Sequence, residues 1–209
     1  MQCFTNEYLY DRTDIESHAL KALESRVERK LLVAKQPRMS ELACLASYNA
    51  LSKYSWSDEL IVPDELETLF RRQVLEPNAE LTLRTKISVL SEITDSTSSK
   101  VREQYEENPY PRWVNIGLPL TRTSIANFVR EENLSLVETG LPGINIPQIL
   151  IAGCGTGEHA LMTAARFENC KVLAIDLSLS SLAYAKRKTD ELGIKNIEYM
   201  QADILDLSA

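Results

Sequence analysis

The sequence predicts an α/β protein in which an all-helical region precedes a doubly wound parallel sheet. Two observations carry this prediction. Apolar residues recur at helical spacing in much of the region 1–104, whereas from Ile149 onward short apolar runs alternate with helical patterns. Such alternation is typical of right-handed crossovers between parallel strands. We therefore expect the first half of such a sheet, in the order β-α-β-α-β, over residues 148–209.

The helical region, residues 1–104, carries several separate helix signals. Between residues 20 and 31 leucine and valine recur at steps of three and four, with charged residues between them. Residues 80–93 fit a helix and a strand equally well, so the pattern leaves both open. A short helix capped by Ser98 or Ser99 should follow.

A connecting region is expected over residues 105–147. It begins with YEENPYPRW at 105–113, where two prolines two positions apart forbid a helix and favour an extended segment. One interpretation of its aromatic rings is a linker that fills a groove between domains. The other is a lid or wall over a ligand site, because a proline-stiffened segment loses little entropy when it is ordered. A helix over 123–132 and a loop over 138–147 complete the region.

Three glycines follow the first strand of the sheet at every second position, in the stretch ILIAGCGTGE at 149–158. A helix over 158–167 comes next, and this strand–loop–helix context makes the glycine spacing meaningful. Gly153 permits the turn, Gly155 lets a ligand lie against the backbone, and Gly157 lets the helix begin close to the sheet. The loop therefore predicts a nucleotide-containing cofactor.

Glu158 narrows the choice of cofactor. A dinucleotide fingerprint has glycine at this position, and a carboxylate in the first turn would repel a pyrophosphate at the helix N-terminus. S-adenosylmethionine has no phosphate, so it is favoured over NAD or FAD. We interpret His159 as a residue of the first helical turn and Cys154 as a small filler rather than a nucleophile.

Two aspartates follow the next two strands. Asp176 ends the second strand, where an acid can accept hydrogen bonds from both ribose hydroxyls; the alternative is a helix cap, for which Ser178 is better placed. Asp203 follows the third strand and could accept from an adenine amino group while Ile204 packs on the ring. The alternative for Asp203 is an ordinary turn aspartate.

Composition excludes several classes of function. The net charge of −7 argues against non-specific binding of nucleic acid, and no run of apolar residues is long enough to span a membrane. The four cysteines, at 3, 44, 154 and 170, form no CxxC pair, so we expect no metal site. Scattered thiols without a secretory signal predict a cytoplasmic protein.

Taken in order, GCGTG at 153–157, AIDLS at 174–178 and QADIL at 201–205 resemble the class I S-adenosylmethionine-dependent methyltransferases. The resemblance implies a Rossmann-like sheet and S-adenosylmethionine as cofactor. One departure is Ile151, because the family often carries an acid two residues before the first glycine, for an indirect hold on the methionine ammonium. The cofactor-binding residues implied are Gly153, Cys154, Gly155, Thr156, Gly157, Asp176, Leu177, Asp203 and Ile204.

Upstream, CFTNEYLY at 3–10 and VREQYEENPYPRW at 101–113 resemble bacterial proteins in which tetratricopeptide repeats precede a methyltransferase domain. This resemblance implies that the chain is a fragment of a longer gene product, with its sheet truncated on the C-terminal side and the strand 149–152 at the open edge. We therefore expect residues 1–209 alone to bind S-adenosylmethionine weakly or not at all and to be inactive. A protein partner would bind through repeats outside the fragment.

Two functions remain open at this point. The first is methyl transfer to an unidentified acceptor, a small molecule or a protein, with no catalytic residue nominated. The second is a non-catalytic binding or scaffold module attached to helical repeats. The glycines of 153–157 and an intact Asp176 favour the enzyme, because loss of function would erode them. An oxidoreductase is disfavoured by Glu158.

Overall fold

The computed structural model describes residues 12–134 and 146–207, and it divides the chain into two compact units, Met1–Ala79 and Glu80–Ala209. The division falls earlier than the boundary expected at residue 104, because Glu80 and the segment after it bond to the sheet-containing unit. The N-terminal segment 3–10 and most of the loop expected at 138–147 lie outside the described residues. Within the described ranges, none of the helices combines the length and the apolar character that crossing a membrane requires.

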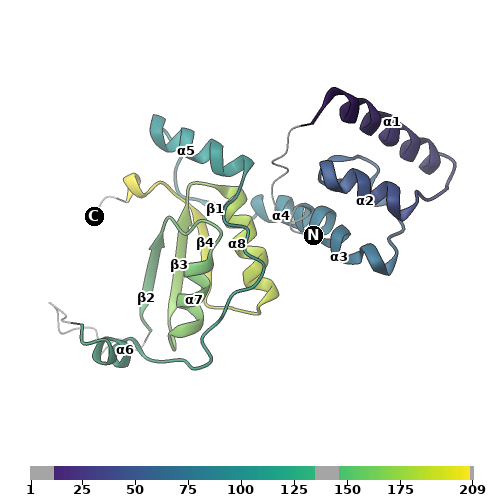
Figure 1. Cartoon of the computed structure of the whole chain (residues 1–209). Helices are drawn as coiled ribbons and strands as arrows, with labels where there is room; N and C mark the ends of the chain where they lie inside the picture. The colour runs from purple at the N-terminus through teal and green to yellow at the C-terminus, as the bar shows by residue number, and fades with distance from the viewer. Residues whose placement is uncertain (1–11, 135–145, 208–209) are drawn as a thin grey trace. The chain divides into compact units, whose positions relative to one another are not determined.

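The first unit is all-helical (Figure 1). Its first helix begins with a capping box, in which the Thr13 hydroxyl accepts from the amide of Glu16 and the Glu16 carboxylate accepts from the amide of Thr13. The described helical elements of this unit are α1 (Asp14–Leu31), α2 (Met39–Tyr48), 3-10 turns at Leu51–Lys53, Ser57–Glu59 and Asp64–Leu66, α3 (Glu67–Phe70), a π-helical turn (Arg71–Leu75) and the start of α4 (Glu76–Arg84).

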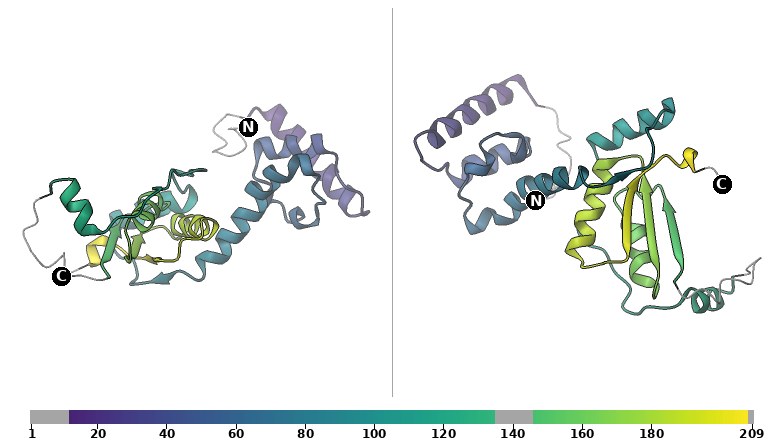
Figure 2. Two further views of the ribbon diagram at one scale, coloured as in Figure 1. Left: turned by 90° about the horizontal axis from the view of Figure 1, so that it is seen from below. Right: turned by 180° about the vertical axis from the view of Figure 1, so that it is seen from behind.

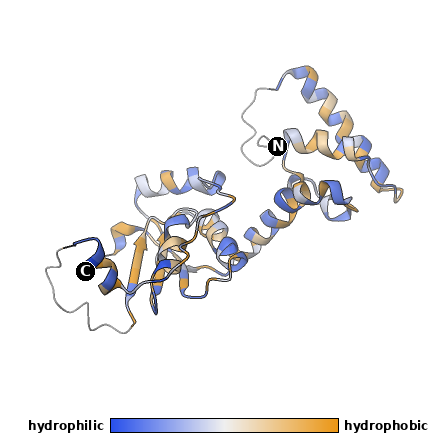
Figure 3. Cartoon of the chain, turned by 60° about the horizontal axis from the view of Figure 1, so that its bottom comes forward, coloured by the Kyte–Doolittle hydropathy of each residue, from blue (hydrophilic) through white to orange (hydrophobic). Residues whose placement is uncertain are grey.

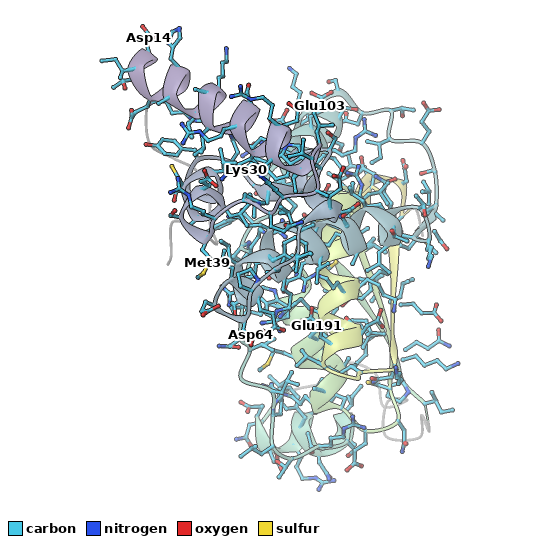
Figure 4. The ribbon with its side chains drawn as sticks, turned by 90° about the vertical axis from the view of Figure 1, so that its right-hand side faces the viewer. Asp14, Lys30, Met39, Asp64, Glu103 and Glu191 are labelled. Carbon is cyan, nitrogen blue, oxygen red and sulfur yellow. The ribbon has the colours of Figure 1, made fainter. Side chains whose placement is uncertain are left out.

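A leucine-rich core holds these helices together. Val27, Leu45 and Val74 are fully buried in it. Two buried polar side chains of this unit, Gln73 and Glu41, also have hydrogen-bond partners. Gln73, in the π-helical turn, accepts from the amide of Leu51 at 3.1 Å and donates to a carbonyl of α2. Glu41, at the start of α2, accepts a hydrogen bond at 2.6 Å from Nζ of Lys30 on α1; Lys30 is labelled in Figure 4.

The second unit contains a parallel sheet of four described strands, in the order β1-β4-β3-β2. In the register, Leu150 pairs with Leu173 and Ala174 pairs with Tyr199. Because β2, β3 and β4 are adjacent and parallel, the two crossover helices lie on one face of the sheet (Figure 2). These elements are β1 (Ser88–Val89), β2 (Gln148–Ala152), α7 (Glu158–Arg166), β3 (Lys171–Asp176), α8 (Leu179–Glu191) and β4 (Ile197–Gln201).

This arrangement confirms the predicted fold class. Strand β2 is uniformly apolar along its centre, as its colour in Figure 3 shows, and among the described strands it pairs only with β3. Leu150 is accordingly 52% exposed. Ser178 caps α8, as predicted, and Gly193 follows the end of α8 with a φ of +69°. The core between sheet and helices is built from small and branched side chains: Leu161, Ala164, Val172, Ala174, Leu182 and Ala185.

The region before β2 differs from the expectation in two places. The stretch that fitted helix and strand equally contains both, since α4 ends at Arg84 and β1 pairs with β4. The cap of α5 (Ser96–Glu107) is Asp95, not Ser98 or Ser99, because the Asp95 carboxylate accepts from two amides of the first turn. Helix α5 ends at Glu107, so it includes the first three residues of the segment 105–113. Further on, Ser124 caps the short helix α6 (Ile125–Glu131).

Candidate cofactor site

The glycine loop, residues 153–157, connects β2 to α7 and is tied to the neighbouring strand. The amide of Cys154 donates to the carbonyl of Ile175 at 2.9 Å. Gly157 has a φ of +83°, and a Cβ at this position would lie 2.5 Å from Cβ of Ala185 and 3.2 Å from the Tyr199 hydroxyl. The close approach predicted for Gly157 is therefore present, and it brings the start of α7 against α8 and β4.

Asp176 lies at the carboxyl end of β3, directly beside the glycine loop. Its Oδ2 accepts from the amide of Gly155 at 2.7 Å, and its Oδ1 accepts from the amide of Ser178 at 2.9 Å. Each carboxylate oxygen can accept two hydrogen bonds. One position on each oxygen is thus occupied by backbone, and one on each remains for a ligand.

A pocket of about 880 Å³ opens at the carboxyl ends of the strands, within the size range of small-molecule sites. Most of the residues predicted to bind the cofactor line it: Gly153, Cys154, Gly155, Thr156, Asp176, Leu177 and Ile204. Glu158 and His159 of the first turn of α7 also line it. Gly157 and Asp203 do not, so the structure separates these two from the rest of the predicted set.

Asp203 is 2% exposed and caps a 3-10 turn, Ile204–Asp206. Its Oδ1 accepts from the amide of Leu205 at 3.0 Å. This is the role of a turn aspartate, the alternative interpretation from the sequence. The adenine contact of Asp203 stays a prediction, while the neighbouring Ile204 is 55% exposed and faces the pocket.

Cys154 is buried beside this pocket, and its environment suppresses ionisation. Burial raises the pKa of the Cys154 thiol well above its usual range, and the negative charge of Asp176 raises it further. A neutral thiol is a poor nucleophile. The burial of Cys154 agrees with its interpretation as a small side chain that fills space beside the loop, rather than as a nucleophile. Among the described residues, no group of three or more His, Cys, Asp or Glu side chains could hold a metal ion.

The aromatic segment that follows α5, residues 108–114, lies directly on the glycine loop; we call it the strap. The indole Nε1 of Trp113 donates to the carbonyl of Thr156 at 3.0 Å, and the Thr156 hydroxyl donates to the carbonyl of Pro111 at 2.7 Å. Tyr110 and Pro111 line the pocket. The strap is therefore a wall of the pocket, the second of the two interpretations.

A cluster of charged and aromatic side chains fastens the strap to α8. Glu80 accepts from Arg112 of the strap at 3.0 Å and from Arg187 of α8 at 2.9 Å. Both guanidinium groups lie 4.9 Å from the ring centre of Tyr184, whose hydroxyl donates to the carbonyl of Trp113. We call this group the Glu80 cluster. Sequence reasoning missed it, because Glu80 and Arg187 are 107 positions apart.

A second contact missed from the sequence holds α5 on α8. The Glu106 carboxylate accepts from the amide of Leu179 at 2.5 Å and from the Ser180 hydroxyl at 2.8 Å. Arg84 donates to the same carboxylate at 2.7 Å. An acid at a helix N-terminus is favourable because it meets unpaired amides and the positive end of the helix dipole. Glu106 thereby fixes the first turn of α8, which follows Asp176.

Comparisons with known proteins agree with this site. Residues 149–209 match the model of a protein family described as a methyltransferase domain. Release factor glutamine methyltransferase of Escherichia coli is 33% identical over 90 residues, which cover 41% of this chain and 32% of that protein. A tRNA (guanine-N(7)-)-methyltransferase of Rubrobacter xylanophilus is 34% identical over 71 residues, covering 30% of this chain and 32% of that protein. The chain spans about a third of the length of these curated relatives.

Solved structures show weaker likenesses. A SAM-dependent methyltransferase from Aquifex aeolicus is 18% identical, with a TM-score of 0.26 over 54% of this chain and 48% of that one. Coclaurine N-methyltransferase bound to N-methylheliamine and SAH is 15% identical, with a TM-score of 0.30 over 100% of this chain and 48% of that one. The assignment therefore rests on the sequence matches and on the site itself. Together these show that residues 149–209 are similar to methyltransferase domains.

Proposed function

We propose that the chain supplies the cofactor-binding part of an S-adenosylmethionine-dependent methyltransferase. One observation carries the proposal. The carboxylate of Asp176 is held between the amides of Gly155 and Ser178, at the rim of a pocket at the carboxyl ends of parallel strands. This is where a doubly wound sheet binds the ribose of a nucleoside ligand.

The chemistry of the lining fits S-adenosylmethionine. The two acceptor positions left on Asp176 match two ribose hydroxyls, and the apolar side chains of Leu177 and Ile204 flank the place where an adenine would lie. Glu158 adds a second carboxylate at the mouth of the glycine loop. Arg166 is the arginine of the described lining, so the two acids leave the lining with net negative charge. This disfavours a phosphate and favours a ligand that carries a sulfonium and an ammonium. The nine residues implied by the resemblance remain our proposed cofactor set.

When bound, the cofactor supplies a methyl group that is already activated by a positive sulfur. The protein therefore has to bind, orient and exclude water rather than to activate a leaving group. Asp176 orients the ribose. The strap, through Tyr110 and Pro111, covers one side of the pocket. No residue is assigned as a general base.

The methyl acceptor stays open as a small molecule or a protein, because the curated relatives named above act on different acceptors. Resemblance of the segment 101–113 supports the bacterial type in which tetratricopeptide repeats precede the methyltransferase domain, with a partner bound through those repeats. The three described cysteines are free thiols, which supports a cytoplasmic protein.

The test is a titration of the ¹⁵N-labelled chain with S-adenosylmethionine and S-adenosylhomocysteine, followed by amide chemical shifts. We expect weak but saturable shifts in the glycine loop, because residues 153–156 line the pocket and, among the described strands, β2 has a neighbour on one side alone. Asp176→Ala should weaken binding roughly 100-fold through the loss of hydrogen bonds to a charged acceptor, about 3 kcal/mol.

The matched control is Asp190→Ala, which removes an exposed aspartate of α8 that pairs with Lys186 outside the pocket. This variant should bind like the wild type. The proposal fails if the wild type shows no saturable shifts up to roughly 10 mM ligand, a concentration at which even a binding free energy of about 3 kcal/mol is detectable. It also fails if Asp176→Ala titrates like the wild type.

A further inference from the structure

The side chain of Ile151 on strand β2 cannot hold the amino group of the ligand. The position two residues before Gly153 is Ile151, whose side chain is 7% exposed and packs in the core of the second unit. An isoleucine side chain accepts no hydrogen bond. If the pocket binds S-adenosylmethionine, as proposed above, the oxygens that receive its ammonium group must come from other elements.

The strap brings such an oxygen to the glycine loop. A Cβ built on Gly155 would lie 4.0 Å from the carbonyl oxygen of Tyr110, so this oxygen lies beside the middle glycine, and both residues line the pocket. In the part of the chain that the structure describes, no donor is recorded for it. The next carbonyl, that of Pro111, already accepts from Thr156. The oxygen of Tyr110 is thus a strap acceptor beside the glycine loop that is available to a ligand.

Glu158 provides a charged acceptor at the same loop. It is the first residue of α7, it is exposed, and it lines the pocket together with Gly155 and Tyr110. The nearest basic side chain of the strap, Arg112, is committed to Glu80 of the Glu80 cluster. The loop end of the pocket therefore presents carbonyl and carboxylate oxygens without a strap cation, which suits a positively charged group.

We propose that the carbonyl of Tyr110 and the carboxylate of Glu158 receive the α-ammonium group of the ligand, in place of an acid on β2. The inference rests on the proposed function, since it concerns the same pocket. The strap then does more than close the pocket, because it supplies one of the recognition groups.

The position of the strap explains why a backbone oxygen can take this role. Two hydrogen bonds join the strap to the loop: Trp113 donates to the carbonyl of Thr156, and the Thr156 hydroxyl donates to the carbonyl of Pro111. The Glu80 cluster fixes the other side of the strap on α8. Tyr110 is therefore held in register with the glycine loop by contacts on both sides, so its carbonyl is oriented before a ligand binds.

A pair of ligands isolates the ammonium group. S-adenosylhomocysteine carries it, and the deaminated analogue lacks it but keeps the carboxylate, the thioether and the adenosine. In the titration described above, we expect the wild-type chain to bind S-adenosylhomocysteine about 10-fold more tightly than the analogue, as for one charge-assisted hydrogen bond. Glu158→Gln should remove most of this difference by weakening only the amine-containing ligand.

Two further variants distinguish a loss of ammonium recognition from a general loss of ligand binding. Thr156→Val removes the hydroxyl that holds Pro111 while it keeps the side-chain shape, so it should also reduce the preference for the amine. Glu198→Gln, on the exposed side of β4 and outside the pocket, should leave both affinities unchanged. Asp176→Ala should weaken both ligands equally, because it acts on the ribose.

Equal binding of the two ligands by the wild type would overturn the inference while leaving the proposed function intact. The same holds if Glu158→Gln weakens both ligands to the same extent. Absence of binding by either ligand would remove the proposed function and the inference together.

Discussion

Gly157 is the position where the structure predicts the largest effect of a single added methyl group. Its φ of +83° lies in the left-handed region, where an L side chain costs about 1–2 kcal/mol. A Cβ would also stand 2.5 Å from Cβ of Ala185 and 3.3 Å from its Cα. Backbone cannot move aside cheaply, and overpacking of a core costs about 1–3 kcal/mol. We expect Gly157→Ala to lower the free energy of unfolding of the second unit by about 2–5 kcal/mol.

Two other glycines separate the contributions. Gly193 has a φ of +69° and open space around its Cβ position, so Gly193→Ala should show the conformational cost alone, about 1–2 kcal/mol. Gly117 has open space and no positive φ, so Gly117→Ala should change stability by less than about 1 kcal/mol. The additional loss of unfolding free energy in Gly157→Ala, relative to Gly193→Ala, measures the steric clash with α8.

The assay is urea unfolding followed by the fluorescence of Trp113, which lies in the second unit. The other tryptophan, Trp56, belongs to the first unit and is replaced by phenylalanine in every variant, so that its effect cancels in the differences. If Gly157→Ala and Gly193→Ala unfold with equal free energies, the close packing of the loop on α8 does not contribute to stability and the reasoning is wrong.

Three more predictions concern charged and thiol groups. Glu80→Gln leaves two guanidinium groups without their shared carboxylate and should destabilise the chain by about 3 kcal/mol in urea unfolding, whereas Asp190→Asn, in an exposed pair, should cost less than about 1 kcal/mol. Hydrogen bonds from Nζ of Lys30 and from the amide of Arg38 lower the pKa of Glu41 to about 2. The ionised carboxylate therefore stabilises the first unit above pH 4.5, and this stability, on the order of 2 kcal/mol, should be lost as the pH falls from 4.5 to 2; Glu41→Gln should flatten that loss. Iodoacetamide followed by mass spectrometry should label the exposed Cys44 and spare Cys154 until the chain unfolds, and equal rates would contradict the raised pKa of the Cys154 thiol.

The elements after β2 could be predicted from sequence because their signals are local. The centre of β2 and most of β3 are short apolar runs, Ser178 caps α8, and Gly193 marks the end of α8. The placement of Asp176 beside the glycine loop also follows, since parallel strands bring their carboxyl ends to one edge. Seven predicted site residues therefore meet in one pocket.

The remaining features depend on partners far away in the sequence. Strand β1 has only two residues, and it exists because Ser88 and Val89 pair with β4. Glu106 caps a helix that begins more than seventy positions later, and Glu80 joins two arginines on different elements. Local patterns give no sign of these partners. Asp203 differs, because its Oδ1 accepts from the amide of Leu205 within a local turn, which was the alternative interpretation from the sequence.

The two backbone amides that hold Asp176 have a consequence for the affinity of the proposed ligand. A free aspartate side chain samples several rotamers, and fixing one of them costs entropy. Here the amides of Gly155 and Ser178 already select one rotamer. If the pocket binds a nucleoside, as proposed, the carboxylate is in its final orientation beforehand, and less of the binding free energy is lost in ordering this side chain.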